Sequence, residues 1–219
     1  MTTLWLTRLI PNPSSREARR DFTNAVNLHY RVMKLFPDDI GDQARQQLGV
    51  LFRAEETPAG PYLLIQSLIQ PDPHKLPDHY GACDSRPLSQ LMAYLRPDLP
   101  VRYRIVANAV RKPRKTTQEI YGLKDRVALS GAAAQDWWTR QATNSGLKLA
   151  SVEMTRLDNA HGTRAQGQQR IRHARTKFEG IAHIENPDLV RQRITSGIGP
   201  GKAYGCGLLS LAPASSGSG

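Results

Sequence analysis

The sequence predicts an α+β fold made of two tandem ferredoxin-like (RRM-like) βαββαβ domains. In the first half of the chain, alternating and helical patterns follow one another as strand, helix, two strands, helix and strand. The second half repeats this order more loosely. A length of 219 residues leaves room for two small domains. We expect them to occupy residues 1–97 and 98–213.

The elements of the first half follow from alternation, capping and turn residues. Residues 2–11 alternate apolar and polar side chains, as a strand does. Ser14 and Glu17 have the spacing of a capping box, which predicts a helix that runs to about Phe36. Turn residues and a proline-rich connector separate the elements that follow. These elements are strands at 50–56 and 61–68, a helix at 89–95 and a closing strand at 101–110.

The elements of the second half follow from the same patterns. They are a helix at 132–146, strands at 147–157 and 170–184, a helix at 187–194 and a closing strand at 207–213. Trp137 and Trp138 lie on the first of these helices, where tryptophans more often fill a core than stack on bases. Residues 214–219 contain only Ala, Ser and Gly, so we expect a flexible tail or an added linker outside the fold.

The positive charge is concentrated in the second half. The chain has 30 basic and 19 acidic residues, a net charge of +11, and residues 1–100 contain 11 of each kind. One charge cluster alone would indicate a solvated surface, but two clusters in one half favour a polyanionic partner. They lack the apolar face of a membrane-surface helix, so we expect nucleic acid. The two clusters are Arg111, Lys112, Arg114 and Lys115, and Arg164, Arg170, Arg172, Arg175 and Lys177.

Other composition features exclude several classes of protein. No run approaches the roughly 20 apolar residues that cross a bilayer, and the first residues lack a secretory signal pattern. We therefore expect a soluble, cytoplasmic protein without a membrane partner. Cys83 and Cys206 are far apart and have no zinc-ligand spacing, so we expect free thiols and no metal or cofactor.

A glycine-rich segment, Gly197 to Gly207, is the most specific motif in the chain. Its five glycines could expose backbone amides to a phosphate chain, with Lys202 supplying charge; Gly199 and Gly201 lie nearest that lysine on its N-terminal side. It is not a Walker A loop, because that motif requires a glycine at the position of Ser196 and a hydroxyl side chain at the position of Ala203. It also lies between a helix and a strand, the reverse of a dinucleotide-binding fingerprint. Alternatively, Gly197 only caps the preceding helix.

This segment, GIGPGKAYGCGLLSLAP, resembles the motif that ends the CRISPR repeat-processing endoribonucleases of the RAMP superfamily. The opening LWLTRLIPNPSSREARRDFTNAVNLHYRVMKLF is similar to the start of their CasE branch, the subunit of the type I-E Cascade complex that processes crRNA. The resemblance implies tandem ferredoxin-like domains that bind the CRISPR repeat RNA hairpin and cut at its 3′ base. It further implies metal-independent attack by a 2′-hydroxyl, a 2′,3′-cyclic phosphate product that stays bound, and other Cascade subunits as partners.

The resemblance assigns catalysis to His29 on the first helix. At 100° per residue His29 shares a stripe with Val32 and Phe36, so it should face inward. A lone inward histidine is more often a core residue, but imidazole also suits proton transfer near neutral pH. Lys34 matches a basic position of the family and either joins the site or stays solvated. Where the family often has tyrosine this chain has Val26, and Tyr30 could supply a phenol only from another angle.

The residues leave three functions to compare. The first is the endoribonuclease, with Arg170 and Arg172 on one face of a basic strand that lies along the RNA stem. The second is a noncatalytic RNA-binding module on the same fold, in which Val26 marks a lost active site. The third is a DNA-binding protein that uses the basic half without sequence preference. We expect the imidazole of the first helix and the glycine-rich segment to meet at one site; if they lay far apart, the nuclease interpretation would fail.

Overall fold

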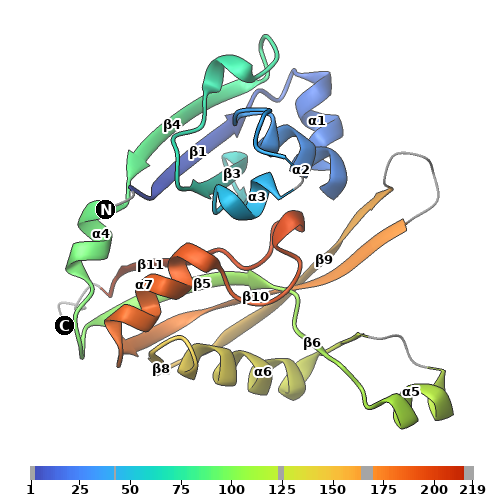
Figure 1. The fold of residues 1–219 in the computed structure, drawn as a ribbon, viewed down its shortest axis with the longest axis vertical. Coiled ribbons are helices and arrows are strands. Elements are labelled where there is room, and N and C mark those ends of the chain that lie inside the picture. The colour runs from blue at the N-terminus through green and yellow to red at the C-terminus, as the bar shows by residue number, and fades with distance from the viewer. Residues whose placement is uncertain (1–2, 42, 123–125, 164–169, 215–219) are drawn as a thin grey trace.

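The computed structural model describes residues 3–41, 43–122, 126–163 and 170–214. Two antiparallel sheets, one from each half of the chain, lie one above the other (Figure 1). Among the described residues, no helix is long and apolar enough to cross a membrane. The expected tail falls almost entirely outside these residues.

The first sheet has the strand order β2-β3-β1-β4, and all of its pairs are antiparallel. Three helices between β1 and β2 cover one face of it, and Val32, Phe36, Phe52 and Ile65 form the centre of its core. A 3₁₀ helix, Pro73–Lys75, precedes β4. The bounds are β1 Trp5–Pro11, α1 Arg16–Phe22, α2 Ala25–Met33, α3 Ala44–Gln47, β2 Leu51–Thr57, β3 Gly60–Ser67 and β4 Gly81–Pro87.

The helix predicted from Ser14 to Phe36 is in fact two helices. Ser15, rather than Ser14, caps α1, because its hydroxyl accepts a hydrogen bond from the Ala18 amide at 3.2 Å. Asn24 then starts α2 by accepting from the amide of Val26 at 2.9 Å. An asparagine side chain that bonds the backbone in this way favours a cap over a helix interior. The continuous stripe expected along one helix is therefore interrupted before His29.

The fourth strand of the first sheet was also predicted wrongly. The sequence placed a closing strand at 101–110, but this segment is β5 (Pro100–Ala107) and belongs to the second sheet. The place beside β1 is taken by β4, with the sequence GACDSRP. Gly, Asp and Pro are uncommon in strands, and this edge strand is mostly exposed, so it carries little apolar alternation.

The second sheet has the strand order β11-β5-β10-β8, and β9 also pairs with β10. The predicted strand at 170–184 is β10, whereas the one predicted at 147–157 divides into β8 and β9. A short β6-β7 ladder and α5 extend from the body (Figure 1). The bounds are α4 Ser89–Tyr94, β6 Val110–Arg111, α5 Lys115–Tyr121, β7 Val127–Ala128, α6 Gly131–Thr143, β8 Leu147–Leu149, β9 Glu153–Thr163, β10 Arg170–Ile184, α7 Pro187–Ser196 and β11 Leu209–Pro213.

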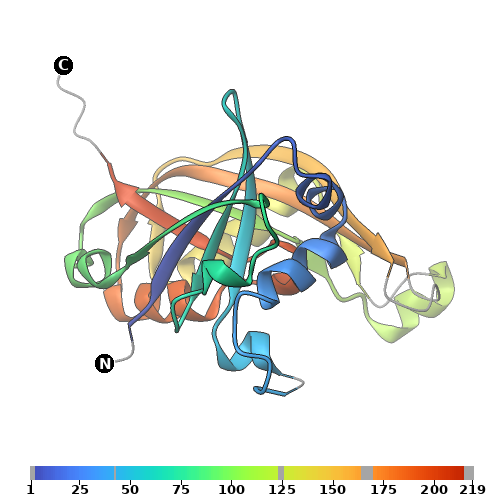
Figure 2. The ribbon, with the colours of Figure 1, turned by 90° about the horizontal axis from the view of Figure 1, so that it is seen from above.

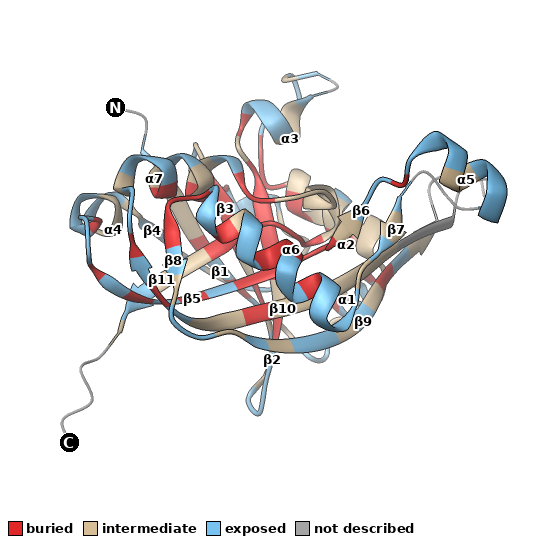
Figure 3. Cartoon of the chain, turned by 90° about the horizontal axis from the view of Figure 1, so that it is seen from below, coloured by how far each residue is buried: buried red, intermediate tan, exposed pale blue. Residues whose placement is uncertain are grey.

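The two tryptophans of α6 belong to the core. Trp138 is fully buried, with its ring centroid 5.4 Å from that of Tyr103 and 5.6 Å from that of Phe178. Trp137 is 6% exposed. Base stacking by these residues is thereby excluded, and the packing role favoured from the sequence is confirmed. Figure 3 shows buried positions along one side of α6, whereas α5 is almost entirely exposed.

Both cysteines are free thiols, as expected, and burial raises the pKa of Cys83 to about 11.

Two buried polar side chains join the halves. The guanidinium of Arg53 on β2 pairs with Glu55 at 2.7 Å and also donates to the Leu208 carbonyl at 2.9 Å and the Ser210 hydroxyl at 3.0 Å. On the neighbouring β3, the amide of Gln66 donates to the Ile194 carbonyl of α7 at 2.7 Å. These contacts fix the first sheet against the C-terminal elements of the second.

Replacing Arg53 with Met should lower the free energy of unfolding by about 3–5 kcal/mol, because Glu55 would remain buried with only its longer contact to Arg104 at 3.5 Å. Urea denaturation measures this. The matched control is Arg86→Met, since Arg86 pairs with Asp84 on the surface, where the side chains are 82% and 69% exposed. That control should change stability by at most about 1 kcal/mol. Equal losses in the two variants would contradict a structural role for Arg53.

Candidate active site

His29 lies in α2 on the side that faces the first core. Its half-buried ring is nearly parallel to that of Phe52, at an interplanar angle of 24° and a centroid distance of 6.3 Å. Leu28 and Val32, its neighbours on α2, are buried. The inward orientation expected from the sequence is therefore confirmed, although the helix that produces it begins at Ala25 rather than before Arg16.

The glycine-rich segment reaches the same place from the other half of the chain. After α7 it forms a short 3₁₀ helix, Lys202–Tyr204, which lies beneath α2 and α3 in Figure 1. The Tyr204 ring centroid is 6.4 Å from that of His29. The expected meeting of the imidazole and this segment is therefore confirmed.

A third ring, that of His173 on β10, completes the group. It stacks on Tyr204 with a centroid distance of 4.8 Å and an angle of 21°. Its Nδ1 is 3.0 Å from the side-chain nitrogen of Asn108, which is 5% exposed. Burial, and then the positive charge of Arg126, lower the pKa of His173 and favour a neutral ring. In that form Nδ1 accepts the hydrogen bond from Asn108.

Sequence reasoning missed Tyr204 and His173. Tyr204 stood out only as part of the glycine-rich motif, and His173 was left unassigned because it has no metal-ligand spacing. The position of His173 beside Arg172 on the longest predicted strand was the only available signal. The contacts of Tyr204 with His29 and with His173 join separate elements, so they depend on tertiary packing that local patterns do not record.

The glycines of the segment mainly permit close packing. Gly197 has φ +72°, and a Cβ there would lie 2.8 Å from the Leu51 side chain. Its amide donates to the Arg193 carbonyl at 2.9 Å, so it caps α7 and has no free donor for a phosphate. Of the two alternatives for Gly197, the cap is correct. Gly199 and Gly201 are half-buried, the first against Trp137 and the second against Asn108.

Lys202 also serves the end of α7. Its Nζ donates to the Ser196 carbonyl at 2.8 Å, where a cation suits the negative end of the helix dipole. Burial lowers the pKa of Lys202, and Arg45 and Arg193 add to this effect. The structure therefore gives Lys202 a capping contact beside the site rather than a contact with the three rings.

Lys34 and Tyr30 form a separate surface group. Lys34 ends α2, and its Nζ lies 3.6 Å from Asp38 and 5.4 Å from the Tyr30 ring centroid. The charge of Asp38, and then Tyr30, raise the pKa of Lys34. Tyr30 is 61% exposed. Of the three residues of this helix singled out from the sequence, His29 is the one that the structure packs against the glycine-rich segment.

Val26 faces β9 instead of open space. A Cβ on Gly162 of β9 would lie 2.5 Å from Cγ2 of Val26 and 2.8 Å from Oδ1 of Asn24. Because real Cβ atoms do not come this close, the start of α2 can pack on β9 only while residue 162 is glycine. This contact sets the distance between the histidine helix and the basic strands.

The described residues of the second basic cluster lie on β10. Arg175 lines a cavity between α1–α2 and β9–β10 together with Tyr204, and its Nε donates to the Asp158 carbonyl at 2.7 Å. Lys177 pairs with Glu179 at 2.7 Å. The backbones of Arg170 and Arg172 pair with β9, but their side chains and all of Arg164 lie outside the described residues.

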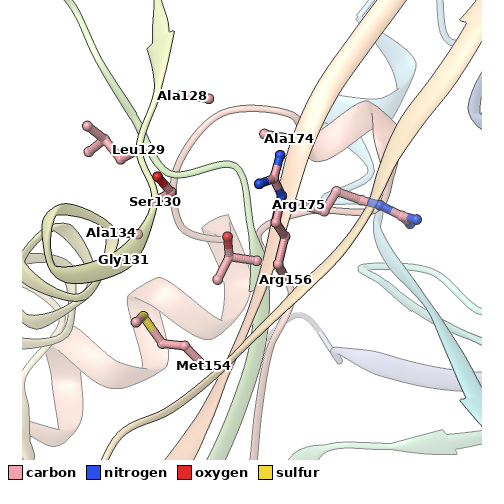
Figure 4. Close-up of a pocket in the computed structure, with 10 residues that line it drawn as sticks. Ala128, Leu129, Ser130, Gly131, Ala134, Met154, Arg156, Ala174 and Arg175 are labelled. Carbon is pink, nitrogen blue, oxygen red and sulfur yellow. The ribbon is translucent and has the colours of Figure 1, made fainter.

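A second pocket lies on the opposite side of the β9-β10 ladder, against the N-terminus of α6 (Figure 4). Arg156 lies on this side near Ser130, whereas the side chain of Arg175 extends to the other side. The ladder therefore presents arginines on both faces.

The first basic cluster is exposed and stands away from the core. Arg111 lies in β6, Lys112 and Arg114 follow it, and Lys115 begins α5. Figure 1 and Figure 2 both show α5 and the outer ends of β9 and β10 on the same side of the molecule. The first cluster therefore lies on the side of the molecule toward which the β9-β10 ladder extends.

Comparison with known proteins gives the class to which the chain belongs. The family model described as CRISPR associated protein matches residues 4–213. The CRISPR-associated endoribonuclease Cse3 of Thermus thermophilus is 29% identical over 223 residues, which cover 96% of this chain and all of the relative. The Cascade subunit CasE of Escherichia coli is 28% identical and covers 90% of this chain and 96% of its own length.

Solved structures agree with this class. Thermus thermophilus Cse3, bound to an RNA that represents a pre-cleavage complex, has a TM-score of 0.79 at 28% identity and covers 96% of this chain and 100% of its own. A chain of a CRISPR RNA-guided surveillance complex, in a pre-nicking state, is 39% identical with a TM-score of 0.69 over 95% of this chain and 99% of its own. The chain belongs to the Cse3/CasE family of CRISPR-associated endoribonucleases.

Replacing Gly162 with Ala should push α2 away from β9 and slow RNA cleavage, because a displacement of about 1 Å at a catalytic group can cost about 100-fold. Single-turnover cleavage measures this. Adding Val26→Ala removes the nearest clashing atom and should restore part of the rate, so the two changes should be strongly non-additive. Normal cleavage by Gly162→Ala would show that this contact does not position His29.

Proposed function

We propose that this chain is a metal-independent endoribonuclease that binds the CRISPR repeat hairpin and cleaves precursor crRNA. In this proposal the adjacent 2′-hydroxyl attacks the phosphate, the product ends in a 2′,3′-cyclic phosphate, and the mature crRNA stays bound. The observation that carries the proposal is the contact of His29 with Tyr204 across the two halves, beside a cavity lined by Arg175. A relative in complex with RNA before cleavage supports the substrate class.

We further propose that the two sheets are ferredoxin-like domains, at 1–97 and 98–213. The strand orders support this. Numbered within its own half, and with β8 and β9 counted as one interrupted strand because both pair with β10, each sheet runs second, third, first, fourth. This is the order that two interleaved βαβ units produce. The second half also has a helix in each βαβ crossover, α6 and α7. In the first half the second helix is missing, and a 3₁₀ turn stands before β4 in its place.

In the proposed reaction, His29 moves a proton. An imidazole can take the proton of the 2′-hydroxyl or give one to the departing 5′-oxygen, and its usual pKa near neutrality suits either role. Lys34 remains a candidate for stabilising charge on the phosphate, although it would first have to leave Asp38. Tyr30 has less support, because it lies on the surface beside Lys34.

The basic residues of the two clusters are the proposed RNA interface. A-form RNA hides its base edges in a deep groove, so contacts should go to phosphates and 2′-hydroxyls. Within the glycine-rich segment, we still propose that Gly199, Gly201 and Lys202 lie next to the RNA backbone. We no longer propose a phosphate contact for the amide of Gly197. The proposed phosphate contacts are Arg111, Lys112, Arg114, Lys115, Arg164, Arg170, Arg172, Arg175 and Lys177.

We also propose that the protein works in the cytoplasm as one subunit of a Cascade assembly, with its bound crRNA. Two related chains support this role, since one is a Cascade subunit and another belongs to an RNA-guided surveillance complex.

Replacing His29 with Ala should lower single-turnover cleavage of a labelled repeat hairpin at least 100-fold, the low end for a lost proton-transfer group, while hairpin affinity changes little. Gel separation of the products measures the rate. The unsubstituted protein should cleave equally well in EDTA and leave a 2′,3′-cyclic phosphate.

Three other outcomes would redirect the proposal. Unchanged cleavage by His29→Ala would remove this residue from the mechanism. Tight hairpin binding without any product, with or without EDTA, would indicate the noncatalytic RNA-binding module. Equal affinity for duplex DNA and for the hairpin would indicate a nonspecific DNA-binding protein.

Replacing Arg114 and Lys115 with Ala should weaken hairpin binding and reduce its salt dependence. The slope of log affinity against log salt should fall by roughly one for each ion pair with a phosphate that the substitutions remove. Cleavage at saturating RNA should stay unchanged, because α5 stands away from α2, the helix that carries His29 (Figure 1). The matched control removes Arg86 and Arg96, two first-half charges, and should leave the slope unchanged; an equal effect would mean that net charge alone drives binding.

A further inference from the structure

Tyr204 contacts both His29 and His173 and also lines a cavity. Its ring neighbours two imidazoles, with centroids 6.4 Å from that of His29 and 4.8 Å from that of His173. It also lines the cavity that contains Arg175, one of the proposed phosphate contacts. A phosphate held by Arg175 in this cavity would therefore lie next to the Tyr204 phenol, whose ring contacts that of His29.

The ring of Tyr204 is fixed by the second half of the chain. His173 stacks on one face of it, and Asn108, which is buried, holds His173 through the 3.0 Å hydrogen bond. The backbone amide of Tyr204 donates to the Gly201 carbonyl at 2.8 Å. A group that is held in place before the substrate arrives stabilises developing charge without a cost of reorganisation.

The chemistry of the site calls for such a donor. When the 2′-oxygen attacks phosphorus, negative charge grows on the two nonbridging phosphate oxygens until the bond to the 5′-oxygen breaks. Lys34 and Tyr30, the other donors near His29 on α2, are engaged with Asp38 and with each other. Lys202 donates to the end of α7. Tyr204 is the donor-bearing side chain that the structure places against the His29 ring.

We propose that Tyr204 is a catalytic residue whose hydroxyl donates a hydrogen bond to a nonbridging oxygen of the phosphate that is cleaved. The inference rests on the proposed function and adds a residue to it. Tyr204 keeps its proton throughout. The bond from phosphorus to the 2′-oxygen forms, the bond to the 5′-oxygen breaks, and the proton passes from the 2′-hydroxyl to the 5′-oxygen with the help of His29.

The first test replaces Tyr204 with Phe, which keeps the stacked ring and removes only the hydroxyl. Single-turnover cleavage of a repeat hairpin at saturating protein should fall about 100-fold, as for the loss of one preorganised donor, while hairpin affinity stays unchanged. The matched control is Tyr94→Phe, because Tyr94 is 43% exposed and α4, which carries it, lies away from α2 in Figure 1. It should cleave at the unsubstituted rate.

A second measurement identifies the oxygen that is contacted. Sulfur in place of one nonbridging oxygen of the scissile phosphate weakens the acceptor, so one of the two stereoisomers should be cleaved more slowly by the unsubstituted protein. In Tyr204→Phe that extra reduction should largely disappear, because the donor is already gone. Fully additive reductions would place the hydroxyl elsewhere and overturn the inference.

The possible failures can be told apart. If the unsubstituted protein cleaves and His29→Ala does not, then normal cleavage by Tyr204→Phe overturns this inference alone. A loss of affinity with an unchanged rate at saturation would likewise reduce Tyr204 to a binding residue and overturn it. If the unsubstituted protein does not cleave, the proposed function and this inference fall together.

Discussion

The buried guanidinium of Arg53 is the interaction on which the site depends, because the site is assembled from two halves of the chain. A charge this deeply buried is tolerated only when it is paired and its donors are satisfied. Glu55 supplies the charge, and acceptors from β5 and the C-terminal segment, the Arg104 and Leu208 carbonyls, take further donors. Burial lowers the pKa of Arg53 despite Glu55, which shows how strongly this position is desolvated.

The strand that carries Arg53, β2, also carries Phe52, on which the His29 ring packs. Phe52, its neighbour on β2, points to the opposite face of the sheet and packs against His29. A Cβ on Gly205, next to Tyr204, would lie 3.5 Å from the same Phe52 ring. One short strand therefore uses one face to hold the second half in place and the other face to seat the two rings that meet across the halves.

Local sequence patterns predicted most of the strands and helices, because these depend mainly on interactions between residues that are close in the sequence. The fifteen residues of β10 alternate in part, and the sequence predicts this strand at its observed bounds. The break at Asn24 was missed because a capping side chain competes with helix continuation by about 1 kcal/mol, too little to stand out in a long helical pattern. His29 was found through the resemblance, whereas Tyr204 and His173 become neighbours only when the two sheets are packed together.

The proposed contacts with the RNA phosphates affect how fast the product is released. Of the proposed binding charges, Arg175 lines the cavity beside Tyr204, whereas those next to α5 stand away from it, and burial lowers the pKa of His173, whose ring stacks on Tyr204. Cutting one linkage leaves the phosphates of the stem intact, so contacts with them are equally strong before and after the reaction. Such uniform binding does not accelerate the chemical step, but it holds substrate and product alike. A protein built in this way releases its product slowly, which suits a subunit that keeps its RNA within a larger assembly.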